Sequence, residues 1–267
     1  MHFKEEKGLK GKYNKFKQKF SFLKWIDPFT YVEILLRKIH PKKEKPSALD
    51  ETIDWIVYLF FAALFAFLIY TAFGIILNTP APMVIVVSGS MEPVMYRGDV
   101  IVLQGVPKEE IKAKEISLPR DTLEETLLIE FGKLQYTGKR ISSIEFENNE
   151  TIEITTEGDV IVYHSKLKNE PVIHRAVAKL KVIDGTYFLT KGDSILNTTI
   201  DQDCGRIIPP GVPEKDCITL YPIPYEEIQG KSVLRIPLIG CVKLWLFDDL
   251  TSLVVNGRLP KDFRGIC

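Results

Sequence analysis

The sequence contains an uninterrupted run of 23 uncharged, mostly apolar residues from Trp55 to Leu77. As an α-helix such a run is about 35 Å long, which is enough to cross a hydrocarbon core of roughly 30 Å. A cleaved secretion signal is the alternative, but it has a much shorter apolar stretch and a much shorter leading segment. We therefore predict a single-pass transmembrane helix within residues 51–79.

The first 50 residues form a basic arm, with thirteen Lys or Arg against six Asp or Glu, a net charge of +7. The whole chain is neutral, so the other 217 residues carry −7. Beside a membrane span, such an arm favours anionic lipid headgroups as its partner. Nucleic acid is the alternative, and we expect no nucleic-acid binding.

The positions of basic residues around the apolar run predict its orientation. Lys42, Lys43 and Lys45 precede the run, whereas Arg97 is the sole basic residue among the twenty that follow it. By the positive-inside rule the N-terminus then lies in the cytoplasm and everything after residue 79 lies outside.

Residues 80–250 have the composition of a β domain. Short β-branched runs bounded by Gly, Asp and Pro predict strands at 83–87, 99–103, 159–163, 171–183 and 186–190. We predict a mainly β fold, in which an N-terminal transmembrane helix is followed by an extracytoplasmic β domain. Residues of about 106–157 are predicted to form an inserted hairpin subdomain with a primed turn at Asn148-Asn149, and residues 251–267 a C-terminal tail.

The apolar run 236–247 is too short to cross a bilayer and predicts a buried strand and a short helix. The four cysteines, at positions 204, 217, 241 and 267, all follow the apolar run, on the outward side where disulfides persist. Cys204 and Cys217, with twelve residues between them, are the candidate pair; free thiols are the alternative, because pairing is not encoded in spacing. No Cys/His cluster has zinc-ligand spacing, and we expect no metal or organic cofactor.

Three short segments contain residues suited to nucleophilic catalysis. Ser90 lies in SGSMEP, thirteen residues after the apolar run, but a serine nucleophile needs a base and a group that orients the base. His174, in VIHRAV, is a candidate base, and a structural histidine with satisfied nitrogens is the alternative. Asp193 and Asp201 lie in LTKGDSILNTTIDQD, where loop carboxylates also serve as ordinary turn residues.

The order of these segments is more specific than any one of them. SGSMEP after an apolar helix, RGDVIV, GDVIVY followed by VIHR, TKGD with a later Asp, and GKSVLRIPLIG together resemble type I signal peptidases of the archaeal and endoplasmic-reticulum kind. The resemblance covers about residues 55–245, apart from 106–157. It implies that Ser90 is the nucleophile and His174 the general base, since His-Arg stands where bacterial relatives have Lys-Arg. Lys179 and Lys181 are poor alternatives for the base, because they lie past the matching position.

The resemblance is weakest at the carboxylate. The family loop runs Gly-Asp-Asn-Asn, three residues, Asp, whereas here Ser194–Leu196 separates Asp193 from Asn197. The interval from Asn197 to Asp201 fits the family spacing. We therefore predict that Asp201 orients His174, with Asp193 as a supporting or substitute carboxylate.

The resemblance also assigns Ser88 to the oxyanion hole, and an ordinary turn serine is the alternative. It implies a membrane-bound serine endopeptidase that cleaves signal peptides from secretory preproteins through an acyl-enzyme, at the cell membrane or endoplasmic-reticulum membrane and beside the secretion translocon. A catalytically silent, membrane-anchored β domain that binds extended peptides is the alternative function. Asn149-Glu150-Thr151 and Asn197-Thr198-Thr199 are glycosylation sequons, the second within the candidate catalytic loop.

Overall fold

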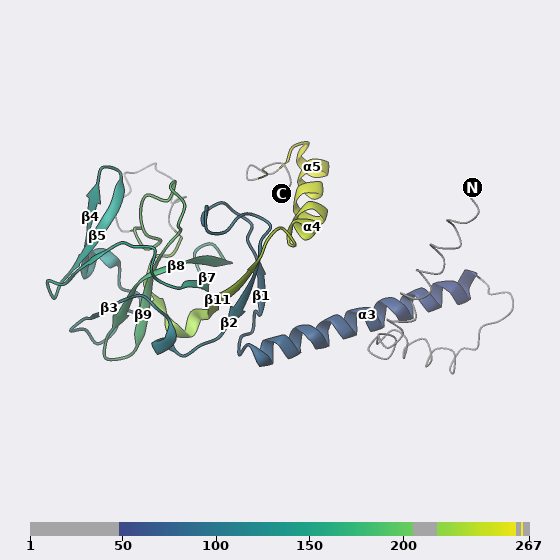
Figure 1. Cartoon of the computed structure of the whole chain (residues 1–267), viewed down its shortest axis with the longest axis horizontal. Coiled ribbons are helices and arrows are strands. Elements are labelled where there is room, and N and C mark those ends of the chain that lie inside the picture. Colours follow the sequence, from purple (N-terminus) through teal and green to yellow (C-terminus); the bar gives the residue numbers. More distant parts are fainter. Residues whose placement is uncertain (1–47, 205–217, 260–262, 264–267) are drawn as a thin grey trace, which may run out of the picture. The chain divides into compact units, whose positions relative to one another are not determined.

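The computed structural model describes residues 48–204, 218–259 and 263 (Figure 1). The chain divides into two compact units, residues 1–73 and residues 74–267. The predicted basic arm lies almost wholly outside the described residues, as does Cys217.

Helix α3, Ala48–Ile76, confirms the predicted N-terminal apolar helix. Its segment Thr52–Ile76 is long and apolar enough to cross a membrane. The helix is apolar on every side rather than along one stripe, which is typical of a helix solvated by lipid. Asn78, two residues after the helix end, takes the left-handed conformation (φ 51°), and the Thr79 N–H bonds to the Gly74 carbonyl at 3.0 Å.

The second unit is built around an eight-stranded sheet, which confirms the predicted mainly β fold. The strand order is β1-β2-β11-β7-β8-β9-β10 with antiparallel neighbours, and β3 pairs with β8 in parallel. The bounds are β1 Met83–Ile85, β2 Val100–Gln104, β3 Lys114–Ser117, β7 Val160–Ser165, β8 Glu170–Lys181, β9 Thr186–Lys191, β10 Ile223–Pro224 and β11 Ile228–Ile236. Three single-turn 3-10 helices lie at Lys108–Glu110, Leu128–Glu130 and Tyr225–Glu227.

A second sheet lies within residues 106–157 and consists of β4 Gly132–Thr137, β5 Arg140–Phe146 and β6 Thr151–Glu153. Its order is β4-β5-β6, so the predicted hairpin is present as β5 and β6. Buried side chains of this sheet, such as Ile144 and Phe146, share one core cluster with Leu180 of β8 and Leu189 of β9. The second sheet therefore packs into the domain core, and its description as an inserted subdomain stays a prediction.

The predicted primed turn between β5 and β6 is wrong. Phe146 N–H bonds to the Glu150 carbonyl at 2.8 Å, which leaves a loop of three residues, and Asn149 alone in this loop has a positive φ (65°). A three-residue loop needs one left-handed residue at its end, whereas a two-residue turn of type I′ needs two. Asparagine tolerates this conformation better than most residues.

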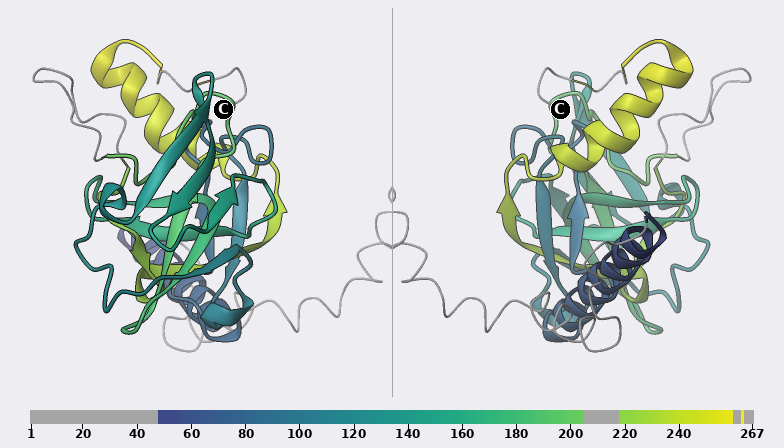
Figure 2. Two further views of the ribbon diagram at one scale, coloured as in Figure 1. Left: turned by 90° about the vertical axis from the view of Figure 1, so that its left-hand side faces the viewer. Right: turned by 90° about the vertical axis from the view of Figure 1, so that its right-hand side faces the viewer.

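The C-terminal prediction of a buried strand and short helix is also wrong in part. After β11 the chain is helical from Cys241 to Asn256, as α4 Cys241–Lys243, a π-helical stretch Leu244–Asp249 and α5 Leu250–Asn256 (Figures 1 and 2). One side of this helix packs on the domain: Cys241 and Leu244 cluster with Ile85 of β1, and Asp249 forms an ion pair of 2.6 Å with Arg97 of the loop between β1 and β2. Most other apolar side chains are exposed, because a lone helix against the edge of a domain buries only one face.

Candidate functional site

Ser90 lies in the loop that joins β1 to β2. Two backbone hydrogen bonds close the base of this loop, from Val86 N–H to the Asp99 carbonyl (2.9 Å) and from Gly98 N–H to the Val86 carbonyl (2.8 Å). Met91, the residue after Ser90, is completely buried in the core under β1 and β2. The serine is therefore held between a closed loop base and a buried anchor.

His174 lies in the middle of β8 and is 2% exposed. Its Nε2 is 2.9 Å from Ser90 Oγ, and its Nδ1 is 2.6 Å from Asp201 Oδ2. With the proton on Nδ1 donated to the carboxylate, Nε2 is free to accept the serine hydroxyl proton. The three side chains form one hydrogen-bonded chain in the order serine, histidine, aspartate.

Asp201 is buried, and its Oδ2 accepts further hydrogen bonds from Thr190 Oγ1 (2.6 Å) and the Tyr163 hydroxyl (3.0 Å). Burial alone would raise the pKa of Asp201, but the charge of His174 and the hydrogen bonds from His174, Thr190 and Tyr163 lower it below its ordinary value. Burial and the neighbouring Asp201 raise the pKa of Tyr163 well above its usual value, which keeps its hydroxyl protonated as a donor. The site therefore holds an ionised carboxylate against the imidazole.

Asp193 has a different partner. Its two oxygens accept from Arg175 Nε (2.8 Å) and Arg175 Nη2 (2.6 Å), a bidentate ion pair. Arg175 follows His174 on β8, and successive side chains of a strand point to opposite faces. The two loop carboxylates therefore have different partners: Asp201 binds His174 and Asp193 binds Arg175.

The alternative bases lie elsewhere. Lys181 Nζ is 2.5 Å and Lys179 Nζ 3.7 Å from carboxylate oxygens of Glu115, on β3. His164 is the only other histidine among residues 48–204, 218–259 and 263, and it is exposed. His174 is thus the histidine that the fold brings to Ser90.

Ser88 lies beside Ser90, with its Oγ 3.3 Å from Ser90 Oγ. This position suits a hydroxyl that donates to an oxygen developing charge at the same centre. Its role in an oxyanion hole remains a prediction.

Cys204 is disulfide-bonded, and so is Cys241. The alternative of a free thiol at Cys204 is therefore wrong. The pairing of Cys204 with Cys217 stays a prediction, because Cys217 lies outside the described residues.

Three residues around Ser90, namely Asn197, Ser194 and Gly192, were given no contact with Ser90 by the sequence analysis. The Asn197 side-chain amide donates to the Ser90 carbonyl at 3.0 Å, and Ser194 N–H donates to the same oxygen at 2.9 Å. Gly192 is packed so closely that a Cβ there would lie 1.9 Å from Asn197 Nδ2 and 2.6 Å from the Ser90 oxygen. The glycine in TKGD, directly after a strand, was the available signal of close backbone approach.

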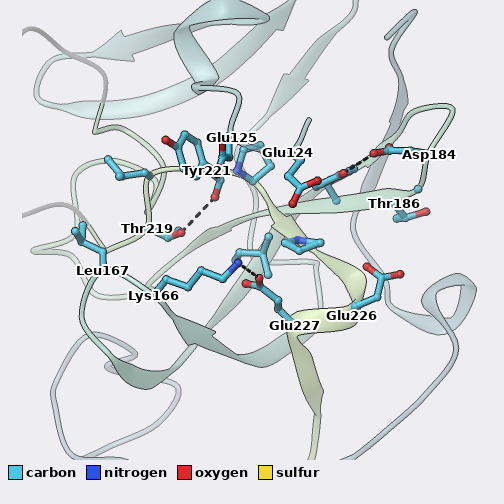
Figure 3. Close-up of a pocket in the computed structure, with 16 residues that line it drawn as sticks. Glu124, Glu125, Lys166, Leu167, Asp184, Thr186, Thr219, Tyr221, Glu226 and Glu227 are labelled. Atoms are coloured by element: carbon cyan, nitrogen blue, oxygen red, sulfur yellow. Dashed lines mark hydrogen bonds and ion pairs between the residues drawn. The ribbon is translucent and has the colours of Figure 1, made fainter. Parts of the chain in front are cut away.

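A cavity of about 610 Å³ lies apart from these side chains (Figure 3). Its polar lining is mainly acidic, with Lys166 and Glu227 paired across it, and Asp184 accepts a hydrogen bond from Tyr187. None of Ser90, His174 and Asp201 lines it. The three hydrogen-bonded side chains therefore lie outside this cavity.

Comparison with curated proteins finds relatives among catalytic subunits of the signal peptidase complex, although no family model matches the chain. The chain is 25% identical over 183 residues to the signal peptidase complex catalytic subunit SEC11 of Colletotrichum graminicola, which covers 68% of this chain and 74% of the relative. The same subunit of Sclerotinia sclerotiorum is 28% identical over the same shares. The resemblance to signal peptidases of the endoplasmic-reticulum kind is confirmed. The subunit from Fusarium vanettenii reaches 30% identity over a shorter region, 49% of this chain and 52% of the relative.

Proposed function

We propose that this chain is a membrane-anchored serine endopeptidase that removes signal peptides from secretory preproteins, with Ser90 as nucleophile, His174 as general base and Asp201 as the group that orients the base. The observation that carries the proposal is the continuous chain of hydrogen bonds of 2.9 and 2.6 Å through these side chains. The catalytic subunits of the signal peptidase complex among its relatives add support.

In the first half of the reaction, Ser90 Oγ attacks the scissile carbonyl carbon while its proton passes to His174 Nε2. Asp201 stabilises the imidazolium that forms, and its lowered pKa keeps it charged for this purpose. His174 then gives the proton to the leaving amine, and the peptide bond breaks to leave an acyl-enzyme. Water completes the reaction by the same steps with the same base.

The tetrahedral intermediates carry a negative oxygen that needs donors. The Ser88 hydroxyl and the Ser90 backbone N–H are the candidates, and one such donor commonly contributes about 3 kcal/mol to lowering the barrier. Ser90's own carbonyl is engaged by Asn197 and Ser194, which fixes the peptide plane on the other side of the nucleophile.

The substrate fits the edge of the main sheet. Strand β1, which leads into Ser90, is an edge strand that pairs only with β2 among the described strands. An extended peptide can add to such an edge, with small side chains before the cleaved bond, as secretory signals have. The anchor, helix α3, ends fourteen residues before Ser90 in the sequence, which suits a substrate whose apolar segment is still in the bilayer.

We place the N-terminus in the cytoplasm, the β domain outside, and the enzyme beside the translocon from which preproteins emerge. A protease-protection assay of the chain inserted into microsomes or inverted vesicles tests the orientation. The wild type is compared with variants in which Lys42, Lys43 and Lys45 are replaced by uncharged residues. Protection of the β domain in the wild type supports this placement.

Cleavage of a preprotein by the detergent-solubilised full chain tests the activity. Ser90→Ala and His174→Ala should each abolish cleavage, whereas His164→Ala, which alters an exposed histidine of the neighbouring strand β7, should leave it unchanged. Cleavage at the wild-type rate by both the Ser90→Ala and the His174→Ala variants would contradict the catalytic assignment. Binding of the preprotein without cleavage by the wild type would favour the silent peptide-binding domain instead.

A further inference from the structure

The loop that carries Asp201 is joined to the second sheet by the first two residues of β5. Ile141 N–H donates to the Thr198 carbonyl at 2.8 Å, and Arg140 Nη2 donates to the Ile195 carbonyl at 3.0 Å. Both bonds end on main-chain oxygens of the loop. The second sheet therefore fixes the path of the loop backbone itself.

A side chain of β4 makes the next contact. The Tyr136 hydroxyl lies 3.0 Å from Thr199 Oγ1 and donates to Asp203 Oδ2 at 2.5 Å, and Thr199 Oγ1 donates to the same oxygen at 2.6 Å. Thr199 and Asp203 stand on either side of Asp201, two residues away in each direction. The Tyr136 hydroxyl thus contacts a residue on each side of Asp201. Hydrogen bonds to a charged acceptor such as the Asp203 carboxylate are stronger than those between neutral groups.

Ile200 provides an apolar anchor at the same place. It is 2% exposed and belongs to the core cluster that contains Ile141 and Ile144 of β5 and Leu189 of β9. The next residue, Asp201, points instead to the histidine. Consecutive residues therefore face opposite ways, one into the core that the second sheet completes and one into the site.

We propose that the second sheet positions the candidate catalytic carboxylate, with Tyr136 as the principal positioning residue. This inference rests on the proposed peptidase function. Residues 192–200 separate the end of β9 from Asp201, and a longer loop loses more conformational entropy when it is ordered. Attachment to the second sheet offsets that cost and keeps Asp201 in line with the imidazole.

Replacement of Tyr136 by phenylalanine tests the proposal, because it removes the hydroxyl and keeps the ring that packs against the core. We expect kcat to fall about tenfold with KM unchanged, since a small misplacement of catalytic groups lowers the rate of the chemical step. Tyr187→Phe is the matched control. Tyr187 belongs to the same core cluster, but its hydroxyl bonds to Asp184 (2.8 Å) and Thr122 (3.2 Å) rather than to the loop.

A double-mutant cycle separates positioning from general stability. If Tyr136 acts through the carboxylate, its replacement has no further effect on single-turnover rates once Asp201 is changed to Asn. Thr199→Ser, which keeps the hydroxyl, should retain the wild-type rate, and Thr199→Val should lose about as much as Tyr136→Phe. The Thr199 pair gives the same test should the phenylalanine variant fold poorly.

Three results would overturn the inference. They are a Tyr136→Phe enzyme with the wild-type kcat, an equal loss in the Tyr187→Phe control, or the same loss in the Asp201→Asn background. Absence of cleavage by the wild-type chain would instead overturn the proposed function, and this inference with it.

Discussion

Replacing Gly192 by alanine tests whether the close packing around Ser90 sets the rate of reaction. Gly192 has no positive φ, so alanine does not strain its backbone, and the effect comes from contacts alone. Its Cβ would lie 1.9 Å from Asn197 Nδ2, 2.6 Å from the Ser90 carbonyl oxygen and 3.0 Å from His174 Nε2. Ordinary contact begins at 3.4 Å, so the Ser90 oxygen is too close by 0.8 Å (3.4 minus 2.6).

A shift of this size reaches the reacting atoms. The Asn197 amide is the end of a side chain and can swing away, at the loss of its hydrogen bond to the Ser90 carbonyl. The carbonyl is backbone and moves only with the nucleophile. A misplacement near 1 Å can cost about 100-fold in rate, so we expect kcat to fall between about tenfold and 100-fold.

The assay is the initial rate of cleavage of a peptide that spans a signal-peptide cleavage site, with thermal unfolding of each variant measured in parallel. Gly185→Ala is the matched control, because its Cβ would meet nothing closer than Tyr187 Cε2 at 3.9 Å. We expect this control to keep the wild-type rate. A Gly192→Ala enzyme with unchanged kcat and melting temperature would refute the reasoning, as would equal losses in the two alanine variants.

Two further predictions concern the carboxylates. Asp201→Ala should lower kcat by roughly a thousandfold or more, as expected when the carboxylate of a catalytic triad is lost. Asp193→Ala should lower kcat less, because Asp193 binds Arg175 rather than His174. Steady-state cleavage rates of the two variants test this order, and the reverse order would contradict the assignment. Because the pKa of Asp201 is lowered below 3.8 in the folded chain, its charge stabilises the fold above its unfolded pKa, and this stabilisation is lost as pH falls through the folded pKa. Denaturant unfolding should therefore show the difference in unfolding free energy between wild type and Asp201→Asn narrowing below pH 3.8, and a difference independent of pH would contradict the shift.

The grouping of Ser90, His174 and Asp201 could be predicted because the order of the short segments that contain them resembles that of a known family, whereas none of the three was distinctive alone. The strands were predictable for a different reason, since β-branched runs bounded by turn residues report local conformation. The partner of Asp193 was not predictable in this way. It depends on which face of β8 each side chain takes, and thus on the register of the sheet.

Other features arise only when distant segments meet. The crowding at Gly192 and the burial of Ile200 both follow from the loop crossing between the nucleophile and the second sheet. The three-residue turn at Asn149 depends on the pairing of β5 with β6, and the two asparagines alone favoured a shorter one. The exposure of the C-terminal helix was not predicted, because an apolar run does not show how much of its surface the rest of the domain covers.

The hydrogen bond from Asn197 to the Ser90 carbonyl bears on how the protein should be produced. The same amide nitrogen is the acceptor atom of a glycosylation sequon, and a sugar attached there would stand against the nucleophile. In a host that modifies this sequon, some molecules would carry the sugar and be blocked while others would not. The measured cleavage rate would then depend on the fraction of unmodified Asn197 as well as on the rate of the chemical step. Expression in a bacterial host that does not modify sequons would distinguish the two causes of low activity.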